Sequence, residues 1–180
     1  MSENAKPRFA TIWLDGCSGC HMSFLDMDEW LLELAGQVQV VYSPLVDAKE
    51  FPTDVDITLI EGAVSSHEDI EKLLKIRART KTLVAFGDCA VTANVPSMRN
   101  PFGLDEVMRE VYLESDAIQP QVPNVIVPQL LDRVVPVHRI VKVDVYIPGC
   151  PPSAATIRAV VSELLAGKQP DIMALTRFGA

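Results

Sequence analysis

The chain has 180 residues, 48% of them hydrophobic, and a formal net charge of -8 at pH 7. This length suffices for one sizeable hydrophobic core, so we expect a single domain over residues 1–180. The acidic balance excludes nucleic acid as an expected partner, because proteins that bind it gather Lys and Arg on one face. No apolar run approaches the roughly 18 residues of a membrane span. The polar start, Met1 to Arg8, has no apolar export-signal core, so we expect a cytoplasmic protein without membrane contact.

Two kinds of periodicity alternate along the chain. Short runs rich in Val, Ile and aromatic residues predict strands, and apolar residues at every third or fourth position predict helices. In chain order the predicted elements are a strand at Phe9–Leu14, a helix at Ser23–Leu34 ended by Gly36, strands at Val38–Tyr42 and Ile57–Glu61, a helix from Ser66 to Arg77, a strand at Leu83–Phe86, a short helix at Leu104–Tyr112, a strand at Val143–Ile147 and a helix from Ser153 to Leu165.

The alternation of strands and helices predicts a parallel sheet covered on both faces. We therefore expect an α/β fold of the flavodoxin-like, doubly wound kind with about five strands. Six prolines between residues 94 and 136 break the rhythm, which predicts an irregular insertion before the last strand, not a second domain. The tail from about residue 170 to residue 180 is expected to lie over the body or over a partner.

The four cysteines all follow predicted strands. Cys17 and Cys20 come just after the first strand, Cys89 follows the fourth and Cys150 follows the fifth. The carboxyl ends of parallel strands share one edge, where such folds build their ligand sites, so we expect the four thiols to converge. In a reducing compartment, cysteines bind metal or do redox chemistry more often than they form disulfides.

The residues around the cysteines are typical of a metal site. Cys17 and Cys20 form a Cys-x-x-Cys pair, and glycines close before Cys89 and Cys150 permit a close approach of the backbone. Four thiolates are the ligand set of a 4Fe-4S cluster or of a closed zinc site. Zinc sites usually join two Cys-x-x-Cys pairs, whereas this chain has one pair and two distant single cysteines, which favours iron-sulfur. A structural zinc module and a flavodoxin-like domain that binds FMN remain alternatives.

Four segments resemble the signature segments of the small subunit of nickel-iron hydrogenases. They are Trp13–Cys20, Glu61 with the following glycine, Gly87–Ala90 and Pro148–Pro152. The stretch Cys20–Asp26 is similar to the short cytoplasmic small subunits of the NAD-reducing, bidirectional branch. The resemblance extends from the first predicted strand to the helix after the last cysteine, so it covers most of the chain.

The resemblance implies that Cys17, Cys20, Cys89 and Cys150 bind one proximal 4Fe-4S cluster. This cluster would relay electrons between the nickel-iron centre of an obligate large subunit and a diaphorase module of iron-sulfur and flavin subunits, which carry FMN, further iron-sulfur clusters and the NAD site. It also implies that no catalytic residue lies in this chain. The related quinone reductase (complex I) subunit has two adjacent cysteines where this chain has a Cys-x-x-Cys pair. That spacing favours the hydrogenase, and a complex I-like iron-sulfur subunit is the alternative.

Two polar residues near the cysteines are candidates for supporting roles. Glu61 ends the third predicted strand near the switch point of the sheet, where a carboxylate can orient a loop amide or meet a partner subunit. A capping or salt-bridged carboxylate is an equal interpretation. His21 adjoins Cys20, and a hydrogen bond from its ring to a cluster sulfur would raise the cluster potential. An ordinary histidine at a helix start or an interface is the simpler interpretation.

Overall fold

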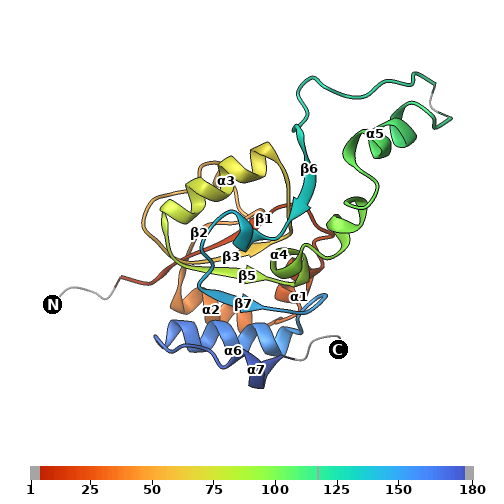
Figure 1. Ribbon diagram of the computed structural model, residues 1–180. Helices are drawn as coiled ribbons and strands as arrows, with labels where there is room; N and C mark the ends of the chain where they lie inside the picture. The colour runs from red at the N-terminus through yellow and green to blue at the C-terminus, as the bar shows by residue number, and fades with distance from the viewer. Residues whose placement is uncertain (1–4, 117, 177–180) are drawn as a thin grey trace.

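The computed structural model describes residues 5–116 and 118–176, and its centre is a five-stranded parallel sheet (Figure 1). The strand order is β2-β1-β3-β5-β7, which is the order of a flavodoxin-like doubly wound sheet. The predicted fold class is therefore confirmed. The strands of this sheet are β1 (Arg8–Trp13), β2 (Gln39–Tyr42), β3 (Val55–Glu61), β5 (Thr80–Phe86) and β7 (Val145–Ile147).

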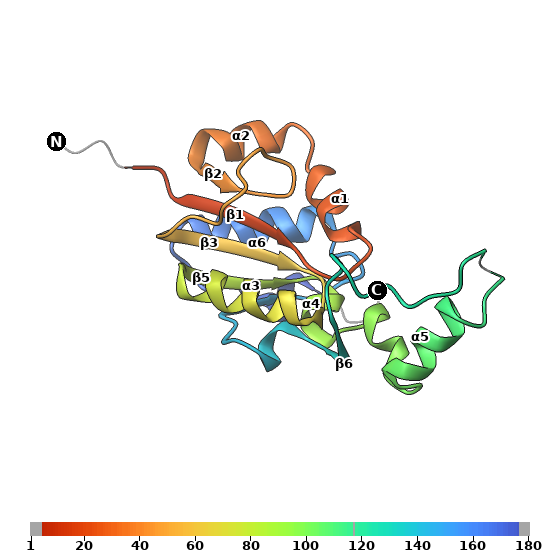
Figure 2. The same cartoon turned by 90° about the horizontal axis from the view of Figure 1, so that it is seen from above.

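Helices cover both faces of the sheet (Figures 1 and 2). On one face lie α1 (Gly19–Leu25), α2 (Trp30–Gln37) and α6 (Ala154–Leu165), with the short α7 (Ile172–Leu175) packed against α6. On the other face lie α3 (His67–Ala78) and α4 (Asp88–Thr92). Neighbouring residues of a strand point to opposite faces, so both cores draw on every central strand, and these strands are apolar almost throughout. Among the described residues, no helix is both long and apolar enough to cross a bilayer.

The predicted helix at Ser23–Leu34 is wrong in one respect, because the structure divides this segment between α1 and α2. Asp28 lies between the two helices at φ 48, in the left-handed region where a helix cannot continue. Gly36 does not end the helix either, since α2 continues through it to Gln37.

A second, two-stranded sheet lies where irregular backbone was expected. The strand β4 (Val64–Ser66) pairs antiparallel with β6 (Leu130–Val135), so the prediction of an irregular segment is wrong for residues 130–135. Local patterns miss this sheet because β4 is only three residues long and its partner is distant in the chain. Two side chains attach β6: Arg99 Nη2 donates to the Leu131 carbonyl at 2.7 Å, and Asn100 bonds both backbone groups of Val134 at 2.9 and 2.8 Å.

The rest of the insertion projects from the body as an arm, described here by residues 95–116 and 118–129 (Figures 1 and 2). It begins with the 3-10 helix η1 (Val95–Arg99) and continues into α5 (Leu104–Tyr112), which has the predicted bounds. No residue of α5 is buried. After β6, a second 3-10 helix, η2 (Val137–Arg139), returns the chain to the body.

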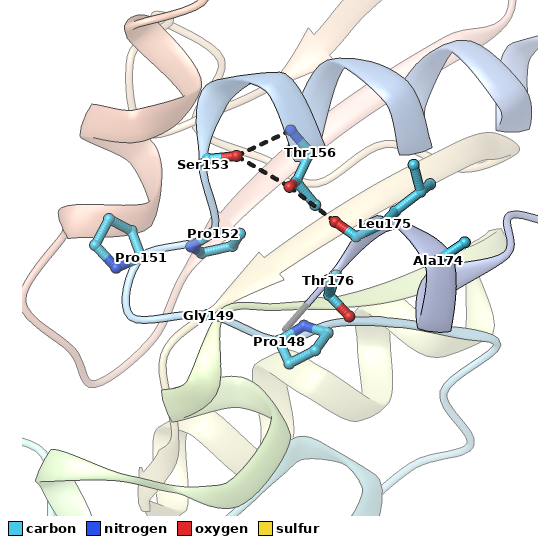
Figure 3. Close-up of a pocket in the computed structure, with 9 residues that line it drawn as sticks. All are labelled: Pro148, Gly149, Pro151, Pro152, Ser153, Thr156, Ala174, Leu175 and Thr176. Atoms are coloured by element: carbon cyan, nitrogen blue, oxygen red, sulfur yellow. Dashed lines mark hydrogen bonds between the residues drawn. The ribbon is translucent and has the colours of Figure 1, made fainter. Parts of the chain in front are cut away.

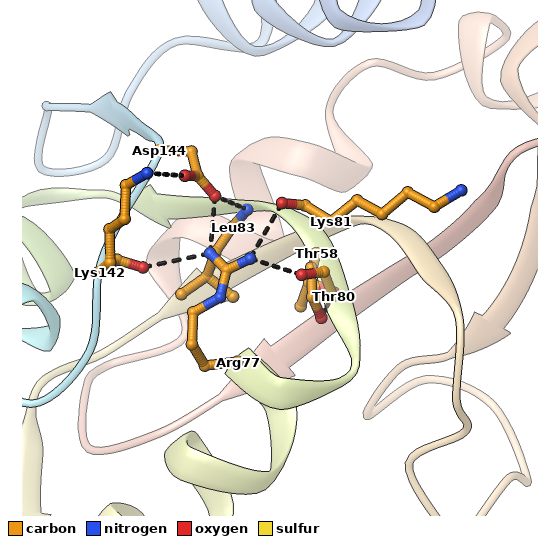
Figure 4. Close-up of polar contacts among 7 residues, drawn as sticks. All are labelled: Thr58, Arg77, Thr80, Lys81, Leu83, Lys142 and Asp144. Carbon is orange, nitrogen blue, oxygen red and sulfur yellow. Dashed lines mark hydrogen bonds and ion pairs between the residues drawn. The ribbon is translucent and has the colours of Figure 1, made fainter.

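The amino edge of the sheet is closed by Arg77 at the end of α3 (Figure 4). Arg77 Nη1 donates to the Asp144 carboxylate at 2.6 Å and to the Lys142 carbonyl at 3.2 Å, and Nη2 donates to the Lys81 carbonyl at 2.9 Å. Asp144 also accepts the Leu83 backbone N–H at 2.9 Å. Burial acts to raise the pKa of Asp144, but the Leu83 hydrogen bond and the Arg77 guanidinium outweigh it and lower the pKa. The network ties α3 to β5 and to the segment before β7.

Candidate metal centre

The four cysteines lie beyond the carboxyl ends of three strands, on one edge of the sheet. Cys17 lies in the loop after β1 and Cys150 in the loop after β7, and both are exposed free thiols. Cys20 and Cys89 are each the second residue of a helix, α1 and α4, and both are buried. Two thiols face inward and two lie at the surface.

The four thiols influence one another electrostatically. Burial raises the pKa of the Cys20 thiol well above its ordinary value, and the Glu61 carboxylate and the other three cysteines raise it further. Burial also raises the pKa of Cys89, and Cys150 and Cys17 add to the rise. All four sulfurs therefore share one neighbourhood. The positive charge of a bound metal would reverse this effect and favour the deprotonated thiolates.

Hydrogen bonds join the segments that carry the cysteines. The Asp88 N–H donates to the Gly149 carbonyl at 2.9 Å, and the Gly149 N–H donates to the Asp88 carboxylate at 2.7 Å. This reciprocal pair fixes the residues next to Cys89 and Cys150 relative to each other. From the other side, Ser23 Oγ of α1 donates to the Pro152 carbonyl at 2.6 Å. The cysteine-bearing segments are thus held together by contacts that do not involve sulfur.

Glycine and N–H donors surround the sulfur atoms. A Cβ added to Gly87, which has φ +84, would lie 2.1 Å from Cys20 Sγ, so only glycine fits there. The Gly19 N–H donates to Cys17 Sγ at 3.4 Å, and Asn94 Nδ2 donates to Cys150 Sγ at 3.5 Å. Hydrogen bonds to sulfur are among the means by which proteins tune iron-sulfur clusters.

Four thiols are the usual ligand number of a 4Fe-4S cluster. Within residues 5–116 and 118–176, no three His, Cys, Asp or Glu side chains surround a position for one metal ion. In a 4Fe-4S cluster each thiolate binds a different iron, so the four sulfurs need not point at one atom. The donor set of four thiols with N–H groups directed at sulfur is chemically suited to such a cluster.

Behind Cys20 lies a buried pair that sequence reasoning treated as two separate residues. Glu61 and His21 are each 2% exposed. Glu61 Oε2 accepts the His21 backbone N–H at 2.9 Å and also contacts His21 Nδ1. The His21 ring stacks on Trp13 with centroids 5.4 Å apart and meets the edge of Phe86 at 6.2 Å. His21 Nε2 is buried and has no hydrogen-bond partner in the described part of the chain.

A cavity of about 370 Å³ lies beside the loop that follows Cys150 (Figure 3). Ser153 caps α6 by accepting the Thr156 N–H at 3.2 Å, and Thr156 Oγ1 donates to the Leu175 carbonyl at 3.1 Å. The segment that includes α7 therefore lies over α6 next to the cysteine loop. Part of the predicted tail is placed here, while residues 177–180 lie outside the described residues.

Known proteins share both the fold and the sequence. The family described as NADH ubiquinone oxidoreductase, 20 Kd subunit, matches residues 17–164. The NAD-reducing hydrogenase HoxS subunit delta of Cupriavidus necator is 40% identical over 95% of this chain and 84% of its own length. The F420-non-reducing hydrogenase of Methanocaldococcus jannaschii has a subunit that is 36% identical over 89% of this chain and 57% of its own length. The chain thus spans little more than half of that archaeal relative.

Solved structures agree with these relatives. A crystal structure of an NAD+-reducing NiFe hydrogenase in the H2-reduced state superposes with a TM-score of 0.91 at 41% identity, covering 96% of this chain and 99% of the other. The NiFeSe hydrogenase of Desulfovibrio vulgaris Hildenborough, at 17% identity and a TM-score of 0.54 over 91% of this chain and 64% of its own, shares the fold.

The fold together with these relatives places the chain in the class of subunits of oxidoreductase complexes. The chain belongs to the NADH ubiquinone oxidoreductase 20 Kd subunit family, and within it to the small subunits of NAD-reducing nickel-iron hydrogenases.

Proposed function

We propose that this chain is the electron-transferring small subunit of a cytoplasmic, NAD-reducing nickel-iron hydrogenase. Cys17, Cys20, Cys89 and Cys150 bind one proximal 4Fe-4S cluster, which supplies reversible one-electron transfer when bound. The observation that carries the proposal is the gathering of all four cysteines at one sheet edge, where each of the other three raises the pKa of Cys20.

The chain's own residues hold the cluster and limit its contact with water. The buried Cys20 and Cys89 face the protein, whereas Cys17 and Cys150 are exposed. The cluster therefore lies near the surface on the side of the exposed pair. A partner docked there shortens the path for electrons and completes the shielding, and we assign this place to the large subunit that carries the nickel-iron centre. A diaphorase module with FMN, NAD and further clusters takes the electrons onward.

The arm and the cysteine loops form the proposed contact with the large subunit. Asn94 bonds Cys150 Sγ directly before the arm begins, so the arm is continuous with the cluster edge. Large apolar side chains of the arm are exposed, among them Met98 at 69% and Phe102 at 60%. The root of the arm is fixed on β6 by Arg99 and Asn100. We further propose that residues 1–180 are one domain, in which 94–136 is an insertion and 170–180 a tail.

The test is metal analysis of the complex that co-purifies anaerobically with the tagged full chain. We expect nickel in a partner subunit, and we expect Cys89→Ala to lower the content by about four iron and four acid-labile sulfide per chain. Zinc in place of iron on this chain indicates the structural zinc module, and flavin released from it indicates the FMN-binding alternative. A nickel-free complex that reduces quinone indicates the complex I-like subunit.

The chain by itself is expected to be inactive, because the proposed cluster relays electrons and the large subunit holds the centre that reacts with hydrogen. Hydrogen uptake or evolution by the isolated chain, loaded with its cluster, would contradict this assignment. The measurement is gas exchange with an artificial electron carrier, with the complete complex as the positive control.

A further inference from the structure

The ends of three neighbouring strands form a row beneath the cysteine loops. Trp13 of β1 is the register partner of Glu61 of β3, and Glu61 is the register partner of Phe86 of β5. The His21 ring packs on both aromatic residues of this row. Glu61 is thereby enclosed under His21, the residue directly after Cys20 in α1.

Glu61 accepts a backbone N–H at the N-terminus of α1 that the helix's own cap residue leaves without a partner. The first N–H groups of a helix have no partner within it, and a cap side chain usually accepts one of them. Ser18 precedes α1 at φ 69, in a left-handed conformation, and makes no side-chain cap hydrogen bond. The third N–H of the helix, that of His21, is accepted instead by Glu61, 40 residues away in sequence. The turn that bears Cys20 is thus attached to the central strand of the sheet.

Burying Glu61 and His21 costs free energy, so the needs of fold stability alone do not explain why this pair is present. A buried carboxylate is unfavourable unless hydrogen bonds compensate for its lost hydration. His21 donates its backbone N–H to Glu61 and contacts it through ring Nδ1, but its own Nε2 is left buried without a partner in the described residues. An apolar pair would avoid this penalty. A charge kept here therefore points to a task at the neighbouring cysteines.

We propose that Glu61 is a positioning residue for the cluster: it holds the Cys20 turn through the His21 backbone N–H, and its fixed negative charge lowers the cluster potential. The inference rests on the function proposed above. The same charge lies close to two of the cysteines, because Glu61 accepts the N–H of the residue after Cys20 and is the register partner of Phe86, three residues before Cys89. A negative charge near a cluster opposes the arrival of an electron, so its loss makes the cluster easier to reduce.

Two substitutions separate the two effects in the anaerobically purified complex. In Glu61→Gln a carbonyl oxygen still accepts the His21 N–H but the charge is gone, so we expect full iron content and a more positive midpoint potential. In Glu61→Ala the acceptor is also gone, so we expect loss of iron and acid-labile sulfide from this chain. The potential is followed by EPR during reductive titration, using the signal that disappears in Cys89→Ala.

The matched control is Asp56→Asn at the opposite end of the same strand. Asp56 also accepts a backbone N–H from a neighbouring strand, that of Arg8 at 2.8 Å, but it lies at the amino edge. We expect its iron content and potential to equal those of the wild type.

An unchanged potential in Glu61→Gln overturns the charge effect even if Glu61→Ala fails to fold. Full iron content in a folded Glu61→Ala overturns the positioning role. If the wild-type complex has no iron-sulfur cluster that depends on Cys89, the proposed function itself has failed, which the unsubstituted protein shows before any Glu61 variant is made.

Discussion

The two edges of the sheet differ in how their polar groups are treated. At the amino edge, Arg77 and Asp144 satisfy each other and the surrounding backbone, and both side chains are partly exposed. At the carboxyl edge, Glu61 and His21 are fully buried, one ring nitrogen has no partner in the described residues, and Gly87 is held at a positive φ against a sulfur. The first edge stabilises the fold. The carboxyl edge contains a close contact and an unpaired ring nitrogen, and such local strain is expected where a protein binds a cofactor.

The largest expected effect is that of Gly87→Ala at the carboxyl edge. The new Cβ meets Cys20 Sγ, so the variant is expected to lose the cluster and much of its stability. Iron content and thermal unfolding measure the two effects. The control is Gly103→Ala, whose φ of +78 is similar but whose Cβ meets nothing within 4 Å; it should cost about 1 kcal/mol and keep its iron. Equal effects of both variants would refute the role of the sulfur contact.

The amino edge should respond in the opposite way. Arg77→Met removes the donor that joins Asp144 to the Lys81 and Lys142 carbonyls, and we expect a loss of about 1–3 kcal/mol in the free energy of unfolding. Iron content per chain should not change, because the substitution lies at the edge remote from the cysteines. Urea unfolding and iron analysis test both statements. A loss of iron in the folded variant would show that the two edges are coupled.

The contacts of Asp144 at the amino edge predict that the stability of the fold depends on pH. The pKa of Asp144 is lowered in the folded chain, so its contribution to stability is present above the ordinary aspartate pKa and lost as the pH falls through the folded value. We expect Asp144→Asn to be less stable than the wild type at neutral pH, with a difference that shrinks below about pH 4. Unfolding curves over a pH series give this difference. A gap of constant size down to acid pH would mean that the carboxylate charge is not the cause.

The smallest effect is expected away from both edges. Gly36 lies within α2 without a positive φ, and a Cβ there meets nothing within 4 Å. Gly36→Ala should stabilise the chain by about 0.5–1 kcal/mol, because alanine loses less conformational freedom in a helix. Thermal unfolding measures the gain, and iron content serves as the control. A destabilised variant would show that the surface of α2 around Gly36 is covered in the assembled protein.

The local pattern of the sequence determined the fold class and the position of the cysteines. The five strands of the main sheet were predicted because their apolar runs follow from burial on both faces. The start of α3 was visible in Ser66 and Asp69, which form a capping box in the structure. The placing of all four cysteines after strands also followed from sequence, since the order of elements decides which loops share an edge.

Only the tertiary structure decided the contacts between distant segments. The pairing of Glu61 with His21 depends on the register of β3 with its neighbours, and the clearance at Gly87 depends on where α1 brings Cys20. The β4–β6 sheet likewise joins a three-residue strand to a remote one. Periodicity reports which face of one element is buried. It carries no information about which partner from another element meets that face, because that choice is made when the elements pack.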